Sequence, residues 1–300
     1  MRLDDLPRSE RIEDRRQGGG GFSLPGGARR SGIGIGTLIV LGLLGWALGI
    51  DPSVLMQGAD TSSRTQPPSD SKTAGRTTAP GDQMGEFVSA VLGSTEVQWQ
   101  KILAQYGKTY EPPILVMFSG ATRSGCGAAE SAMGPFYCPN DRKVYLDTSF
   151  FRDLERRFQA CEAGSKSCQF SQAYVIAHEI GHHVQNLLGV LPKAQQLQQR
   201  MDKVEGNQLQ VRVELQADCF AGVWANHSQK DWQFIEPGDV EAALQTASAI
   251  GDDRLQRQAQ GYVVPDAFTH GSSAQRTRWF MTGLKSGSIE ACDTFAADQL

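Results

Sequence analysis

Two histidines lie four positions apart in the stretch AHEIGHHVQ, where His178 is followed directly by Glu179 and His182 comes three residues later. Residues four apart in an α-helix project from one face, so both imidazoles can reach the same metal ion. Glu179 lies one step round the helix, from where its carboxylate can reach a water bound to that ion. The flanking residues are apolar, which predicts a buried helix over residues 171–189. The pattern predicts zinc chemistry; core histidines bonded to backbone carbonyls are the alternative.

A third ligand is expected on a second helix. The three-histidine pattern of metzincins is absent, because Gln185 and Leu188 occupy the positions of its glycine and third histidine. The stretch ELQAD places Glu214 32 residues after His182, which leaves room for a loop and a returning antiparallel helix. Asp218 follows one turn later on the same face. This spacing predicts a His₂Glu site for one Zn²⁺ per chain, with Asp218 accepting a hydrogen bond from a ligand imidazole.

Other readings of these positions stay open. Glu214 and Asp218 could instead belong to a structural ion pair. Glu205 and His227 are weaker candidates for the third ligand, outside any such pattern. We expect His183 to be structural, because it points away from the face shared by the two ligand histidines.

Residues that could stabilise a transition state follow in the stretch FTHGSSAQRTRW. We expect His270 to act there as a catalytic residue and Arg276 to support a developing oxyanion. A loop or capping role is the alternative for His270, and Ser272 is well placed to cap the next helix. The strand KVYLD could hold an extended peptide by strand addition.

The periodicity along the chain predicts an α+β domain over residues 84–300. A helix is expected over 86–107, a buried strand over 112–120 and two short strands over 133–147, with mostly helices after Ser149. We therefore expect a small sheet with antiparallel strands beside a mainly helical body that carries the HExxH helix.

Residues 31–50 carry no charge, and about 20 such residues are enough to cross a bilayer. Arginines precede this segment, which predicts a cytoplasmic arm over 1–30, one transmembrane helix in the lipid bilayer and an exported remainder. A cleaved signal peptide is the alternative, with small residues Ala47 and Gly49 at its end. Residues 51–83 are rich in Ser, Thr, Pro and Gly and read as a flexible tether.

Charge and cysteines agree with an exported domain. Residues 31–300 hold 22 basic and 28 acidic side chains, which gives no basic patch for nucleic acid. The even number of cysteines favours disulfides in an oxidising compartment, but sequence leaves 15 connectivities open. Short loops favour the first two of these three pairs: Cys126 with Cys138, Cys161 with Cys168, and Cys219 with Cys292.

The chain resembles the family of putative neutral zinc metallopeptidases, bacterial membrane proteins with one span. The resemblance is carried by MRLDDLPRSERIEDRR and its glycine run, the apolar span, SGCGAAESAMGPFYCPNDRKVYLD, AHEIGHHVQ, ELQADCFAGVWA and THGSSAQRTRWF. It implies a gluzincin-like core in which His178, His182 and Glu214 bind zinc and Glu179 is the base. It implies no substrate.

These observations predict a zinc-dependent endopeptidase, anchored in the bacterial cytoplasmic membrane, that cleaves peptide or protein substrates of the cell envelope outside the cytoplasm. Two alternatives remain. The first is an envelope scaffold or adaptor whose metal is structural and closed by a fourth protein ligand. The second is a zinc amidase that acts on cell-wall material. A structural site has no need of Glu179, which favours the enzyme.

Overall fold

A computed structural model of the chain describes residues 1–16, 80–130, 133–156 and 166–300. The expected membrane helix over 31–50 lies outside these ranges, as does the expected tether up to residue 79. Within the described ranges no helix is both long and apolar enough to cross a membrane.

A four-stranded sheet carries the order β1-β2-β6-β5. Its central strands, β2 (Ile114–Phe118) and β6 (Lys143–Asp147), pair in parallel. The edge strand β5 (Phe136–Cys138) runs antiparallel to β6 and forms the hairpin expected from the sequence. Strand β2 is a buried apolar run, the pattern of a strand covered on both faces.

The first sixteen residues pack against the domain, and three of them form a strand of this sheet. The other edge strand, β1 (Ile12–Asp14), pairs in parallel with β2, and the backbone N–H of Arg15 donates to the carbonyl of Met117 at 2.7 Å. The chain before β1 packs on helices, where the N–H of Ser9 donates to the Ser89 carbonyl at 3.0 Å. A separate arm over 1–30 is therefore wrong for residues 1–16. A single span would place β1 and β2 on opposite faces of a bilayer, where they could not pair.

A smaller hairpin was not expected. Strands β3 (Ala121–Ser124) and β4 (Gly127–Glu130) pair with each other, and the disulfide Cys126–Cys138 ties their turn to the end of β5. The remaining pair, Cys219 with Cys292, which no short loop favours, is also bonded. The pairing of Cys161 with Cys168 lies outside the described residues, because Cys161 does.

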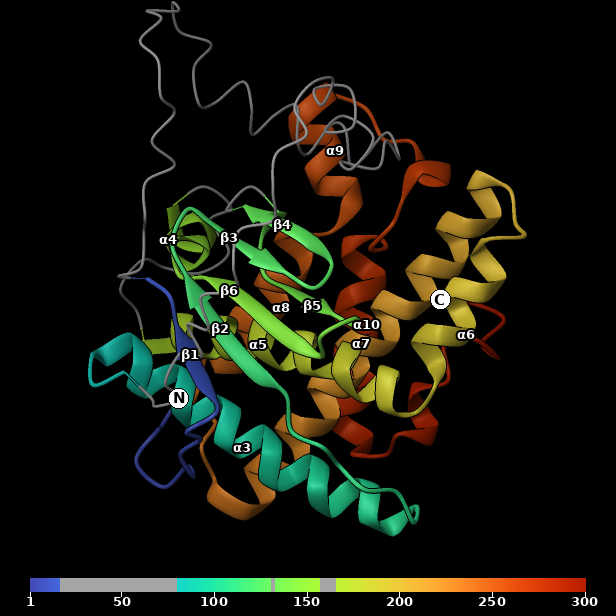
Figure 1. Cartoon of the computed structure of the whole chain (residues 1–300). Coiled ribbons are helices and arrows are strands. Elements are labelled where there is room, and N and C mark those ends of the chain that lie inside the picture. Colours follow the sequence, from blue (N-terminus) through green and yellow to red (C-terminus); the bar gives the residue numbers. More distant parts are fainter. Residues whose placement is uncertain (17–79, 131–132, 157–165) are drawn as a thin grey trace, which may run out of the picture.

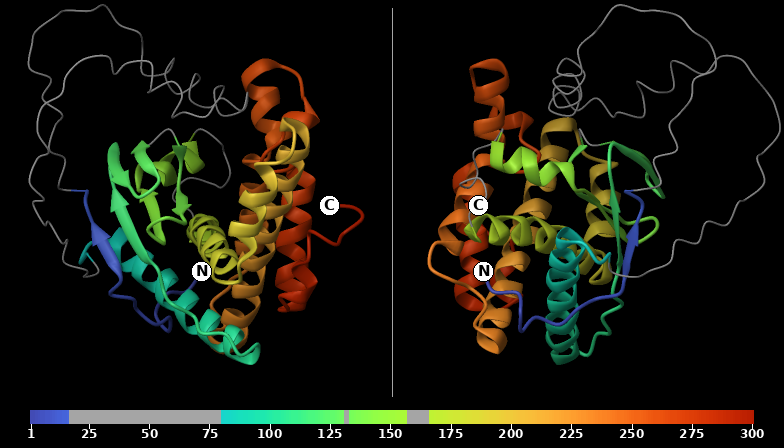
Figure 2. Two further views of the ribbon diagram at one scale, coloured as in Figure 1. Left: turned by 45° about the vertical axis from the view of Figure 1, so that its right-hand side comes forward. Right: turned by 90° about the vertical axis from the view of Figure 1, so that its left-hand side faces the viewer.

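Helix α5 (Lys166–Leu187) lies between the sheet and the helical body (Figure 1, Figure 2). It contacts β5 and β6 on one side and α7 and α8 on the other. The remaining helices of the described residues are α3 (Gln83–Gln105), α4 (Ser149–Arg156), α6 (Val190–Gln198), α7 (Lys203–Trp232), α8 (Asp239–Ala249), α9 (Asp252–Gln260) and α10 (Ser273–Ser286), with 3₁₀ turns η2 (Pro265–Ala267) and η3 (Glu290–Cys292).

Three glycines bring the helices of the body into close contact. A Cβ on Gly181 of α5 would lie 2.9 Å from the Ala217 carbonyl of α7. A Cβ on Gly222 of α7 or on Gly283 of α10 would collide with the backbone of the facing helix. Real Cβ contacts are longer than this, so only glycine permits these approaches. Helix α7 is thereby held between α5 and α10, and polar side chains of all three can meet.

The α+β class with a small sheet and a mainly helical body is confirmed. Peptide binding by strand addition to β6 is wrong, because β2 and β5 already pair with its two edges. Sequence could not decide this point, since the period of two in KVYLD is the same for a central and an edge strand.

Candidate metal centre

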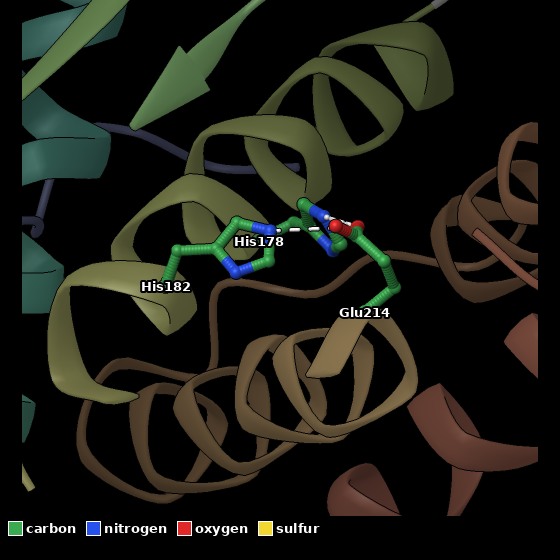
Figure 3. Close-up of side chains that lie close together, drawn as sticks. All are labelled: His178, His182 and Glu214. Atoms are coloured by element: carbon green, nitrogen blue, oxygen red, sulfur yellow. Dashed lines mark hydrogen bonds and ion pairs between the residues drawn. The ribbon is translucent and has the colours of Figure 1, made fainter. Parts of the chain in front are cut away.

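Three side chains that are far apart in sequence meet where α5 crosses α7. His178 and His182 project from α5 toward Glu214 of α7 (Figure 3). The Oε2 atom of Glu214 lies 3.2 Å from Nε2 of His178 and 3.4 Å from Nε2 of His182. Ligand atoms about 2.05 Å from a tetrahedral zinc ion are about 3.3 Å from each other. These two distances fit a His₂Glu zinc site, and all three ligand atoms lie within 4.8 Å of one another.

The Nδ1 atom of His178 is held by Asp218, at 2.8 Å from Oδ1. Asp218 is fully buried and also accepts hydrogen bonds from Tyr174 Oη at 2.5 Å and from Arg276 Nε and Nη2 at 2.8 and 2.9 Å. A carboxylate with these donors stays ionised, so Nδ1 must donate to it, and Nε2 is the nitrogen that faces Glu214 and can bind a metal.

The Nδ1 atom of His182 faces a different acceptor, Oε1 of Gln185 at 2.8 Å. The other oxygen of Glu214, Oε1, accepts a hydrogen bond from Gln210 Nε2 at 2.9 Å. Each of the three expected ligands is thus oriented by a partner outside the ligand set. This is the arrangement that metal ligands require for fixed geometry and tautomer.

Protons compete with a metal for these ligands. Burial alone would lower the pKa of His178, but the adjacent Asp218 and Glu214 outweigh burial and raise it to about 10. Burial would likewise raise the pKa of Glu214, but His182 and His270 hold it well below its usual range. Metal binding must therefore displace protons from the imidazoles, which makes the affinity fall as pH falls.

Glu179 lies beside the triad but does not belong to the group of three converging ligand atoms. Its side chain is buried, and desolvation raises the pKa of its carboxyl above the usual value, although His178 and His182 oppose this effect. A carboxylate with a raised pKa is a stronger base than a solvated one, and general bases work best when their pKa approaches the working pH.

His270 lies near enough to Glu214 to help lower the pKa of that carboxyl. Asp252, which sequence did not indicate, fixes the segment that carries His270. Its Oδ2 accepts the backbone N–H groups of Thr269, His270 and Gly271 at 2.7, 2.6 and 3.0 Å. Its Oδ1 lies 3.3 Å from His270 Nδ1.

Arg276 has a different position from the expected one. Its guanidinium is buried against Asp218, and its remaining donors reach Tyr174 Oη and the Ile250 carbonyl. A guanidinium committed to these acceptors is not presented to a substrate oxyanion. The expected oxyanion role of Arg276 is therefore wrong, and its contacts make it a support of Asp218.

The other candidates lie away from the triad. His183 faces the sheet, where Nε2–H donates to the Glu111 carbonyl at 2.7 Å and Nδ1 lies 3.1 Å from Tyr137 Oη. His227 Nε2–H donates to the Gly287 carbonyl at 2.8 Å. Glu205 is exposed in the capping box of α7, and Ser272 caps α10 as expected.

Sequence reasoning missed four buried polar residues around the triad. They are Tyr174, Gln185, Gln216 and Asp252. The first three interrupt otherwise apolar helix faces, and polar residues at such positions need buried partners. That signal was present in the sequence, although it does not say which partner each residue meets.

The fold and the triad together define an α+β protein with a His₂Glu metal-binding geometry on two packed helices. The chain belongs to the family described as "Putative neutral zinc metallopeptidase", whose model matches residues 1–295. It is 47% identical to uncharacterized protein YpfJ of Escherichia coli K12 over 297 residues, which cover 98% of this chain and 99% of that protein. It is 42% identical to uncharacterized protein Rv2575 of Mycobacterium tuberculosis H37Rv over 265 residues, which cover 84% and 85%. No solved structure matches the chain.

Proposed function

We propose that this chain is a zinc-dependent endopeptidase with a gluzincin-like centre, in which His178, His182 and Glu214 hold one Zn²⁺. The observation that carries the proposal is the convergence of two histidine nitrogens and one carboxylate oxygen, all within 4.8 Å of one another, with the oxygen 3.2 and 3.4 Å from the nitrogens. Three protein ligands leave a position for water, which is the pattern of catalytic and not of structural zinc sites.

Zinc bound at this triad would acidify a water and polarise a substrate carbonyl. Glu179 then takes the proton of the attacking water and delivers it to the leaving amine. Its raised pKa suits both steps, since a weaker acid holds the proton more firmly and still releases it to an amine. His270, oriented by Asp252, supplies a hydrogen bond or positive charge where negative charge develops on the carbonyl oxygen.

We place the folded domain outside the cytoplasm, where it would cut peptide or protein substrates of the cell envelope. Two disulfides among the described residues support this location, since disulfides persist in oxidising compartments. Anchoring by the apolar segment 31–50 remains part of the proposal, as a segment that enters the membrane without crossing it. Residues 1–16 share the sheet of the domain, so we place them on the same side of the membrane.

Cleavage of a peptide library by the full chain, read by mass spectrometry, tests the proposal. The full chain is required because β1 completes the sheet. The comparison is with Glu179→Gln, after equal zinc contents have been measured. Cuts made only by the native chain are expected. If neither protein cuts and both hold zinc, the peptidase reaction is wrong, and peptidoglycan fragments tested next would reveal an amidase instead.

A further inference from the structure

A chain of buried side-chain amides leads away from His182. Gln185, one turn later on α5 and fully buried, places Oε1 2.8 Å from His182 Nδ1. Its Nε2 donates to the Val213 carbonyl at 2.8 Å and to Gln216 Oε1 at 3.0 Å, both on α7. Gln216 Nε2 in turn donates to the Cys292 carbonyl at 3.0 Å. Two helices and the C-terminal segment are thus joined to one imidazole.

We call this series of hydrogen bonds, from His182 through Gln185 and Gln216 to the Cys292 carbonyl, the relay. Two backbone carbonyls fix the direction of every hydrogen bond in it. A carbonyl oxygen only accepts, so the amide nitrogens must face Val213 and Cys292. The oxygen of Gln216 must then face Gln185, and the oxygen of Gln185 must face His182. Because that oxygen also only accepts, His182 Nδ1 must carry a proton. Nε2 is the nitrogen that faces Glu214, 3.4 Å away, and it can bind a metal once its own proton is displaced.

The far end of the relay is fixed covalently. Cys292 is bonded to Cys219, the residue after Asp218 on α7. Cys219 lies three positions after Gln216, so the disulfide and the hydrogen bond from Gln216 attach Cys292 to neighbouring turns of one helix face. The side chains of both cysteines are fully buried.

We propose that Gln185 and Gln216 are positioning residues for zinc, and that the Cys219–Cys292 disulfide holds the carbonyl on which their orientation depends. The relay selects the Nδ1–H tautomer of His182 as Asp218 does for His178. This inference rests on the metal site of the proposed function but not on peptide cleavage. It is tested with zinc alone, so its failure and the failure of the peptidase reaction are distinguishable.

The first test is a double-mutant cycle. The zinc affinities of the full chain, of each single variant and of the double variant are measured by competition with a chelator. Gln185→Leu is expected to weaken zinc binding by about tenfold to a hundredfold, the usual cost of losing a residue that orients a ligand. Gln216→Leu should cost less. The double variant should bind no more weakly than Gln185→Leu, because both substitutions break one relay. Gln98→Leu, which removes a buried glutamine that bonds Asp231 far from the site, is the matched control.

A spectroscopic readout separates positioning from general loss of packing. In zinc-loaded protein labelled with ¹⁵N-histidine, His182 should show a hydrogen-bonded Nδ1–H signal that shifts in Gln185→Leu, while that of His178 stays in place. Zinc affinities of Gln185→Leu and Gln216→Leu equal to that of Gln98→Leu would overturn the proposal. If the losses of zinc affinity multiply in the double variant, Gln185 and Gln216 act independently and the proposed relay is wrong.

The disulfide is tested by paired substitutions. Cys219→Ser with Cys292→Ser should weaken zinc binding by about as much as Gln216→Leu, whereas Cys126→Ser with Cys138→Ser, at the β5 end of the sheet, should leave it unchanged. Equal zinc affinity in both double variants would overturn the role of Cys219–Cys292. If the first double variant does not fold, the test uses Cys292→Ser alone in the zinc-loaded protein. A shift of the His182 Nδ1–H signal in that variant supports the role of the disulfide, and an unchanged signal overturns it.

Discussion

The Nδ1 atom of His178 lies 2.8 Å from Oδ1 of Asp218, one turn along α7 from Glu214. One helix therefore supplies both a candidate metal ligand and the carboxylate that orients another ligand. Asp218 in turn depends on Arg276 of α10, so the metal centre is tied into the packing of three helices. Several consequences can be measured without knowing the substrate.

Removing one partner of the buried Asp218–Arg276 pair should be costly. Arg276→Leu removes the guanidinium from the buried Asp218 carboxylate and leaves only His178 beside it as a positive group, so we expect the free energy of unfolding to fall by about 3–5 kcal/mol. Urea unfolding of metal-free protein measures this. Asp218→Leu combined with Arg276→Leu should cost less than the sum of the single changes. Lys101→Gln, which breaks the exposed pair with Asp231, should cost at most about 1 kcal/mol. Equal costs for Arg276→Leu and Lys101→Gln would contradict this account.

His270→Ala should slow the reaction without removing the metal. Loss of one group that stabilises developing negative charge typically lowers kcat by about 10²- to 10³-fold. We expect KM to change little and zinc content to stay at one per chain. Steady-state kinetics on a peptide identified from the library measures kcat and KM. A kcat within a few-fold of the native value would assign His270 to the loop and not to the reaction.

His183 predicts a pH dependence of stability. Burial lowers its pKa to about 4 in the folded chain, although the hydrogen bond to the Glu111 carbonyl opposes this effect. The unfolded chain takes up the proton at a pKa of about 6.5. The contribution of neutral His183 is therefore complete above about pH 6.5 and is lost as pH falls toward 4.

The stability difference between the native chain and His183→Gln should accordingly shrink by about 2–3 kcal/mol between pH 7.5 and 4.5. Urea unfolding of both chains, with a chelator present at both pH values, gives this difference and cancels the other titrating groups. A difference that stays constant with pH would show that His183 is not held neutral in the folded state.

The pairing of β1 with β2 predicts where the amino-terminal residues lie. Cysteines introduced at the exposed positions Glu10 and Lys285 should react from the same side of the cytoplasmic membrane with a maleimide that does not cross it. No free cysteine occurs among the described residues to compete with them. The labelling is done in cells whose outer barrier is permeabilised and whose cytoplasmic membrane is intact. Labelling of Lys285→Cys but not of Glu10→Cys would contradict a shared location.

Local spacing was enough to predict the centre, because i, i+4 geometry brings His178 and His182 to one face whatever surrounds them. Glu214 and Asp218 could be found for the same reason, once a returning helix was assumed. The residues that orient the ligands and Asp218 could not be found in this way. Arg276 and Gln216 act across helix contacts that the glycines of α7 and α10 permit, and periodicity does not encode which residues face each other there.

The sheet shows the same limit. The apolar run of β2 and the alternation of β6 are both recognisable, and both strands were predicted. Strand β1 has only three residues, of which two are acidic, so no pattern of alternation could distinguish it from an arm. Its place in the sheet depends on pairing with β2, which lies about a hundred residues later in the sequence.

The most direct measurement is a crystal structure of the zinc-loaded chain with anomalous data at the zinc absorption edge. We predict one ion, bound by His178 Nε2, His182 Nε2 and a Glu214 oxygen at about 2.0–2.2 Å, with water as the remaining ligand. A zinc ion bound elsewhere would contradict the assignment of the triad. A fourth protein ligand in place of water would contradict the catalytic role and make the metal structural.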